Sequence, residues 1–176
     1  MPAAGIGLET VKAALLGGHR VRALARSETW LSRRSGRHLP SVHRRTHDAF
    51  LEIDRILVDA MKAAGVKRLV AVTGLGAGDS RGHGGILYDG IVFPLLLKRV
   101  YDDKDVQEWI IRSSGLDWTI VRPGLLTSGP AAGRYRVLSV RQEWRFGVIS
   151  RADVANFLVR QIDDRTLIGA TPLLIN

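Results

Sequence analysis

The sequence contains no cysteine, which excludes disulfide bonds, thiolate catalysis and cysteine-ligated zinc. It also lacks long hydrophobic runs. The longest, residues 91–97, contains Pro94 and is far shorter than the roughly 20 apolar residues that span a bilayer. The start of the sequence has no basic and then apolar pattern of a secretory signal. We therefore expect a cytoplasmic protein without a membrane segment.

Acidic residues are scarce in residues 17–47. This stretch holds eight arginines against the single acid Glu28, and it accounts for most of the net charge of +9. Positive charge confined to one segment without regular periodicity is not typical of a helix face that binds nucleic acid, so no nucleic-acid partner is predicted. Four of the five histidines fall in the same stretch, but their spacing fits no compact ligand motif, so no metal site is predicted.

Hydrophobic periodicity and turn signals divide the rest of the chain into helices and strands. Helices are expected at residues 6–16, 50–64, 93–113 and 151–161, strands at 19–26, 67–73, 117–122 and 171–175, and a short strand pair at 134–140 and 145–149. Ser150 is the predicted N-cap of the last helix, with Asp153 at its third position. This alternation indicates an α/β fold, a Rossmann-like parallel sheet with helices on both faces. We expect one domain over residues 1–176, with an irregular basic loop at 27–49.

Three segments carry a resemblance to a known family: residues 65–73, 104–124 and 149–155. The middle segment ends in Ser-Gly-Leu-Asp-Trp-Thr-Ile-Val-Arg-Pro-Gly and is the most specific of the three. In this order they resemble the NAD(P)-binding atypical short-chain dehydrogenases/reductases. That group includes NmrA-like proteins and relatives of the flavin and biliverdin-IXβ reductases. The resemblance implies a dinucleotide at the carboxyl ends of the strands.

The resemblance also implies which residues form the nicotinamide end of the site. Thr73, at the end of its strand, is expected to bond the ribose or a substrate carbonyl, although it is equally an ordinary strand-end threonine. Gly74 would let a ligand approach the backbone closely, or would belong only to a flexible loop. The turn that follows the next strand is expected to touch the nicotinamide, and it consists of Pro123, Gly124 and Leu125.

Lys104 and Thr73 are the candidate catalytic residues that the resemblance implies. Familiar family members carry a tyrosine four residues before the lysine, but this position is Val100 here, and Tyr101 is one residue out of register. One residue rotates a side chain by about 100° around a helix, so Tyr101 is a poor substitute. The missing tyrosine argues against alcohol oxidation more than against every reduction. A surface role for Lys104 stays open.

The phosphate-binding end looks incomplete. Gly5, Ile6 and Gly7 match the end of the family's glycine-rich turn, which holds the pyrophosphate on a helix N-terminus. No residues precede this turn to form a first strand, and the stretch after Arg26 is short. We therefore expect a truncated sheet that lacks the first strand and part of the central β-α-β region. The residue that ends this strand favours NAD when it is an acid and NADP when it is an arginine, so Arg26 with Ser27 favours NADP as the cofactor, with NAD as the alternative.

These observations predict an NAD(P)H-dependent oxidoreductase that passes a hydride to a flavin, quinone or carbonyl acceptor. Trp144, Tyr88, Tyr135 and Phe146 are candidates for lining the acceptor pocket, although core packing explains them equally well. Two alternatives stay open. The missing tyrosine favours an NmrA-like module that senses NADP without catalysis, and the shortened turn favours an inactive truncated remnant. The partner would be a small molecule, and exposed sheet edges also allow self-association into an oligomer.

Overall fold

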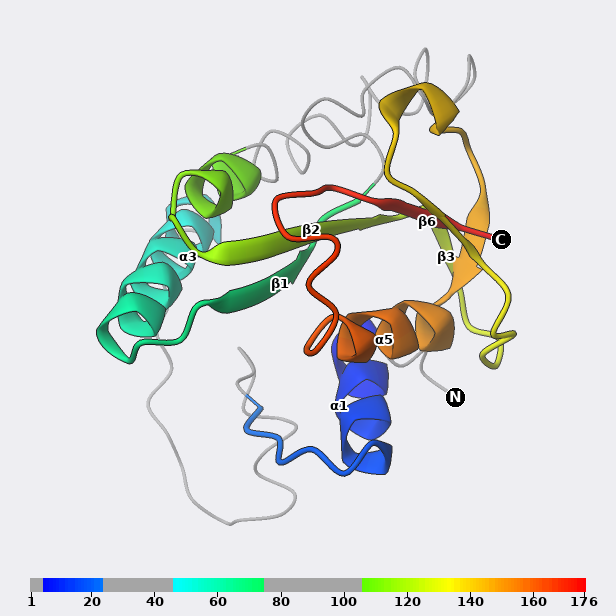
Figure 1. Ribbon diagram of the computed structural model, residues 1–176, viewed down its shortest axis with the longest axis horizontal. Coiled ribbons are helices and arrows are strands. Elements are labelled where there is room, and N and C mark those ends of the chain that lie inside the picture. Colours follow the sequence, from blue (N-terminus) through cyan, green and yellow to red (C-terminus); the bar gives the residue numbers. More distant parts are fainter. Residues whose placement is uncertain (1–4, 24–45, 75–105) are drawn as a thin grey trace.

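The computed structural model describes residues 5–23, 46–74 and 106–176 (Figure 1). The helices are α1 (Ile6–Leu16), α3 (Thr46–Ala63), the short 3₁₀ helix η4 (Arg141–Glu143) and α5 (Arg151–Arg160), and residues 106–112 are also helical. The strands are β1 (Arg68–Val72), β2 (Asp117–Pro123), β3 (Leu125–Thr127), β4 (Arg136–Leu138), β5 (Val148–Ser150) and β6 (Leu173–Ile175). None of the helices in these ranges combines the length and hydropathy needed to cross a membrane.

The main sheet has the strand order β1-β2-β6-β4. β1 and β2 are parallel over their full length, from Arg68 opposite Asp117 to Val72 opposite Val121. β6 runs parallel to β2, and only β4, on the far side of β6, is antiparallel. β3 and β5 form a separate parallel pair. The expectation of an α/β, Rossmann-like and mainly parallel sheet is confirmed. Within the described residues β1 is an edge strand.

Helices cover both faces of this sheet. On one face α5 packs against the strands and α1 packs against α5 (Figure 1), around a buried cluster made by Val121, Ile149, Val154, Phe157, Leu158 and Leu174. On the other face α3 and residues 106–112 pack around Val58, Ile110 and Leu116. Successive residues of β1 divide between the two clusters, Leu69 to the second and Val70 to the first. This alternation is what a strand buried on both faces requires.

Most of the predicted elements are confirmed, and their ends follow local signals. α1 begins and ends as predicted, and α3, β1, β2, α5 and β6 lie within a few residues of their expected bounds. Gly65 and Gly115, with φ of 68° and 71°, follow the two helices before β1 and β2. A glycine adopts this left-handed conformation at little cost, so each ends its helix sharply.

Two strand predictions were wrong in whole or in part. Residues 19–23 of the strand expected at 19–26 form no strand, and all of them except the half-buried His19 are exposed. The rest of that segment lies outside the described residues. Alternating side chains favour a strand only where a neighbour completes the hydrogen-bond ladder. The expected pair at 134–140 and 145–149 does contain β4 and β5. They do not pair with each other, however, because β4 joins β6 and β5 joins β3.

The start of α5 confirms the predicted cap and adds a contact that was not expected. The Ser150 hydroxyl accepts a hydrogen bond from the Asp153 amide at 3.0 Å and donates to the Asp153 carboxylate at 2.7 Å. The same carboxylate accepts from the amides of Ala132 and Gly133, at 3.0 and 2.9 Å. Asp153 is fully buried. It therefore joins the helix to the loop before β4.

The turn between β2 and β3 is held by a close backbone approach. The Gly124 amide donates to the carbonyl of Leu174 at 3.0 Å, and the Leu125 amide donates to the carbonyl of Gly147 at 2.9 Å. A Cβ at Gly124 would overlap the Gly147 carbonyl oxygen, and a Cβ at Gly147 would lie 2.7 Å from side-chain atoms of Ile175. Both positions therefore require glycine because the chains meet there.

We predict that Gly124→Ala destabilises the protein by about 1–3 kcal/mol, the usual cost of forcing a methyl group into a packed interior. Gly129→Ala is the matched control, because an added Cβ there meets nothing within 4 Å, and its effect should stay within about 0.5 kcal/mol. Urea unfolding measures both free energies. Equal stabilities for the two variants would contradict the assigned packing of the turn.

The Asp153 carboxylate should make the protein sensitive to acid. Burial is the largest influence on the pKa of Asp153 and raises it, but the bonds from Ala132, Ser150 and Gly133 together outweigh it and hold the pKa below its ordinary value. The folded state therefore binds fewer protons than the unfolded state. This contribution to stability is complete above the unfolded pKa of about 3.9 and is lost as the pH falls below it.

We therefore predict that the free energy of unfolding drops more steeply between about pH 5 and pH 3 for the natural protein than for Asp153→Asn. Asp163→Asn serves as the control, because Asp163 is exposed and makes no side-chain hydrogen bond within the described residues. Parallel pH curves for the natural protein and Asp153→Asn would show that Asp153 is not the acid-sensitive group.

Candidate functional site

The carboxyl ends of β1 and β2 lie side by side, because the two strands are parallel and in register. The Thr73 amide donates to the Val121 carbonyl at 3.0 Å, which continues the ladder one residue beyond β1. The edge formed in this way carries five residues that the sequence predicted for the nicotinamide end, namely Thr73, Gly74, Pro123, Gly124 and Leu125. The first four are buried, and Leu125 is 59% exposed. In an open parallel sheet this edge is where ligands bind.

Beneath this edge lies a buried ion pair between Glu108, from helical residues 106–112, and Arg122, from β2. The Arg122 guanidinium donates through Nε to Oε1 of Glu108 at 3.0 Å and through a terminal nitrogen to Oε2 at 2.5 Å. Arg122 is 0% and Glu108 is 2% exposed. A two-point contact between planar groups fixes both side chains, and removing either partner from such a pair costs about 3–5 kcal/mol.

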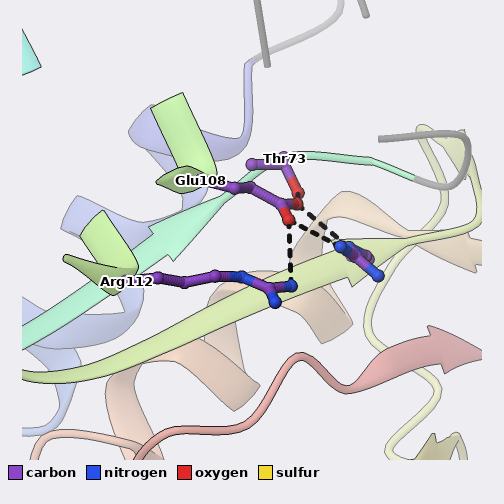
Figure 2. A network of polar contacts seen from close by, with 4 residues as sticks. Thr73, Glu108 and Arg112 are labelled. Atoms are coloured by element: carbon purple, nitrogen blue, oxygen red, sulfur yellow. Dashed lines mark hydrogen bonds and ion pairs between the residues drawn. The ribbon is translucent and has the colours of Figure 1, made fainter. Parts of the chain in front are cut away.

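Two further side chains converge on the Glu108 carboxylate (Figure 2). The hydroxyl of Thr73 donates to Oε1 at 2.8 Å. Arg112, one helical turn after Glu108, donates to Oε2 at 3.3 Å, and its side chain is 40% exposed. The carboxylate therefore lies between two guanidinium groups and a hydroxyl, and the strand end, the helix and β2 are joined at one point.

Tryptophan rings extend the network on either side. The Arg122 guanidinium carbon lies 5.0 Å from the centre of the Trp144 ring, and that of Arg112 lies 5.8 Å from the Trp118 ring. Both distances are within the range of cation–π attraction. The Trp144 indole N–H donates to the carbonyl of Leu138 at 2.8 Å, which satisfies its polar atom inside the core. Arg122 thus links the strand ends to the segment between β4 and β5.

Sequence reasoning did not assign a role to Glu108 or Arg122, although both stand in the resembling segment. A sequence signal for a buried charge at Arg122 was available, because this residue ends a run of strand-forming residues that the sequence pattern predicts to be buried. A fully buried arginine must have a charged or strongly polar partner. The pattern alone does not say which acid provides it, because Glu108 is 14 residues away in sequence.

The candidate phosphate-binding residues open α1. The carbonyl of Gly5, the N-cap, accepts from the amides of Leu8 and Glu9 at 3.1 and 3.3 Å. Ile6 packs against the buried cluster beneath α5. A Cβ at Gly5 or Gly7 would meet nothing within 4 Å, so the space around this first turn is open. Val70 and Val72 of the β1 segment that leads to Thr73 pack against the same buried cluster.

A cavity of about 240 Å³ lies between the first turn of α1 and the start of α5. Its lining includes Glu9, Ser128 and Arg151. The Glu9 carboxylate forms an ion pair with Lys12 at 2.8 Å, whereas Arg151 donates to the Ser128 hydroxyl at 3.1 Å. Both walls of the cavity are therefore charged.

Several sequence-predicted residues fall elsewhere. Arg26, Ser27, Lys104 and Tyr88 lie outside the described residues. Trp144 and Tyr135 belong to the core, since Trp144 is 6% exposed and Tyr135 makes an edge-on contact with Phe157 at 6.0 Å between ring centres. Phe146 is 49% exposed. In the described part of the chain no three His, Asp or Glu side chains gather as metal ligands would.

Comparison with known proteins places this geometry in a family. A curated relative from Bacillus subtilis (strain 168), the uncharacterized sugar epimerase YhfK, is 32% identical over 108 residues, which cover 61% of this chain and 44% of YhfK. The chain thus matches less than half the length of that relative. The structure of ChuY from E. coli CFT073 superposes with a TM-score of 0.74 at 25% identity, over 98% of this chain and 93% of ChuY.

A second structure has the same fold. ChuY from Escherichia coli O157:H7, described as an anaerobillin reductase, superposes with a TM-score of 0.70 at 23% identity, over 99% of this chain and 93% of that one. A family model described as NAD(P)H-binding matches residues 39–165, well over half of the chain. This match includes Thr73, Glu108 and Arg122. The protein therefore belongs to the NAD(P)H-binding family.

Proposed function

We propose that the protein binds NADPH across the carboxyl ends of β1 and β2 and transfers its hydride to a flavin, quinone or carbonyl acceptor. The observation that carries the proposal is the family match over residues 39–165, joined to the convergence of Thr73, Gly74 and Pro123 at one edge of a parallel sheet. Reductase chemistry is supported by the description of ChuY from E. coli O157:H7, which has the same fold.

The described residues fit a dinucleotide. The first turn of α1 has open space around Gly5 and Gly7, and its first amides have no partner within the helix, which is how helix N-termini hold phosphate groups. The nicotinamide half would lie at the other end of the site, along Thr73 and Gly74 on β1 and the turn after β2. When bound, NADPH supplies the hydride.

The residues of this chain would bind and orient the cofactor and would keep water away from it. Pro123 and Leu125 would contact the nicotinamide, while Gly124 holds their turn against β5. Lys104 would bond the ribose, and Arg26 with Ser27 would bind the 2′-phosphate, which makes NADP the preferred cofactor over NAD. The sequence has Val100 at the position where familiar members of the resembling family carry a tyrosine, so the proton that follows the hydride would come from water.

A second candidate function is a binding module that senses NADPH without catalysis. Val100 in place of the tyrosine is the observation that favours it. In that case the same strand edge binds the dinucleotide and no acceptor follows. The third alternative is an inactive remnant without cofactor affinity. A binding measurement alone distinguishes it from the reductase and from the sensing module.

We predict saturable quenching of the fluorescence of the four tryptophans when the protein is titrated with NADPH, and at least tenfold weaker binding of NADH. A tenfold ratio corresponds to about 1.4 kcal/mol, a reasonable value for one arginine–phosphate contact. Arg26→Glu should abolish this preference. Arg22→Glu, the same charge change at an exposed site nearby, is the control and should keep it.

Absence of saturation up to millimolar NADPH would reject both nucleotide-binding functions and favour the remnant. Where NADPH binds, its oxidation is followed at 1:1 stoichiometry with a flavin, a quinone and an aldehyde in turn. Turnover of one of them supports the reductase. Binding without turnover of any of the three selects the sensing module.

A further inference from the structure

Arg151, the first residue of α5, carries a positive charge that no acid balances. Its guanidinium donates to the Ser128 hydroxyl at 3.1 Å and to the Leu126 carbonyl at 3.5 Å, and both of these acceptors are neutral. Among the described residues Arg151 forms no ion pair. The nearest acid in sequence, Asp153, is buried and accepts from one hydroxyl and two backbone amides instead.

The helix gains little from this arginine. The amino-terminal end of a helix carries partial positive charge, so a cation in the first turn is unfavourable there. Arg151 occupies the first position of α5 and contributes no ion pair in return. An anion that reaches its guanidinium would therefore meet a charge that the fold has not already neutralised.

The same arginine lines the cavity of about 240 Å³ between α1 and the start of α5. These two helices pack against each other (Figure 1), and residues 128–130, which follow β3, complete the lining. Residues 128–130 are exposed, so the cavity opens to solvent. The Asp153 carboxylate binds the amides of Ala132 and Gly133 and so fixes the far end of this loop. The cavity therefore has a defined wall and an open entrance.

The two sides of the cavity differ in charge. On the α1 side Glu9 presents a carboxylate, which is paired with Lys12 at 2.8 Å. On the other side the Arg151 guanidinium is bound to Ser128 at the end of β3. β3 begins at Leu125, in the turn proposed to contact the nicotinamide, and Ser128 follows about 10 Å further along the extended chain. The positive side of the cavity is thus the side that continues from the nicotinamide turn.

We infer that this cavity binds an anionic group of the hydride acceptor, a phosphate or a carboxylate, and that the Arg151 guanidinium contacts it. A planar guanidinium presents paired N–H donors that match the oxygens of either group. The inference rests on the proposed reductase function and narrows its substrate class. Among flavins, quinones and carbonyl compounds, the acceptor is one that carries a negative charge. The pyrophosphate of the cofactor stays at the first turn of α1.

Two pairs of compounds test the inference, because the members of each pair differ only in the anionic group. FMN carries a phosphate that riboflavin lacks, and 4-carboxybenzaldehyde carries a carboxylate that benzaldehyde lacks. Dissociation constants are measured by isothermal titration calorimetry on the protein saturated with NADP⁺, which has no hydride to give, so no turnover disturbs the measurement. The anionic member of at least one pair should bind about tenfold more tightly, as expected for one charge-assisted hydrogen bond.

Arg151→Gln removes the charge and keeps a polar side chain. This variant should lose the preference for the anionic compound, bind NADP⁺ within about twofold of the natural protein and unfold at the same urea concentration, because Arg151 is half-buried and forms no ion pair among the described residues. Arg160→Gln is the matched control, with the same charge change at the other end of α5, about 14 Å away along the helix axis. It should keep the preference.

Equal affinities within both pairs overturn the inference, and so does a preference that survives Arg151→Gln. A preference that Arg160→Gln removes as well also overturns it, because the net charge of +9 would then attract every anion without a site. If Arg151→Gln weakens NADP⁺ as much as FMN, the guanidinium binds the pyrophosphate and the inference is wrong. Failure of the natural protein to bind NADP⁺ or NADPH overturns the proposed function and the inference together, whereas failure of the inference alone leaves cofactor binding intact.

Discussion

The buried ion pair between Glu108 and Arg122 is the interaction on which the rest of this structure depends. A guanidinium that is 0% exposed in the middle of the sheet is tolerable only because a carboxylate meets it at two points. That requirement fixes the helix of residues 106–112 over β2. The same carboxylate accepts the hydrogen bond of Thr73 at the end of β1, and the same guanidinium lies within cation–π distance of the Trp144 ring. One pair thereby sets the positions of the strand edge, the helix and the segment beyond β4.

How far the sequence predicts this fold depends on whether the information is local. Periodicity and capping signals predicted α1, β1, β2 and α5. Each of these signals, such as an amphipathic helix pattern, a helix-ending glycine or the Ser150 cap, depends on only a few neighbouring residues. Pairing is not local. β4 and β5 were placed correctly but assigned to each other, and residues 19–23 alternate like a strand without forming one.

The candidate site divides in the same way. The resemblance named Thr73, Gly74 and the turn after β2, and the parallel register brings them together at one edge. It did not reveal that Gly124 is needed because the chain passes against Gly147, a contact between segments 23 residues apart. Nor did it reveal that the Thr73 proton is directed to Glu108. Both facts come from tertiary contacts between segments that are distant in sequence.

A double-mutant cycle on the ion pair tests the account most directly. The free energy of unfolding is measured for Glu108→Leu, Arg122→Met and the double variant. We predict that Glu108→Leu costs about 3–5 kcal/mol because it leaves a buried guanidinium without its carboxylate. Arg122→Met should cost less because Arg112 still meets the acid, and the double variant should cost clearly less than the sum of the two. Single losses that add within about 0.5 kcal/mol would contradict the account, because independent side chains behave in that way.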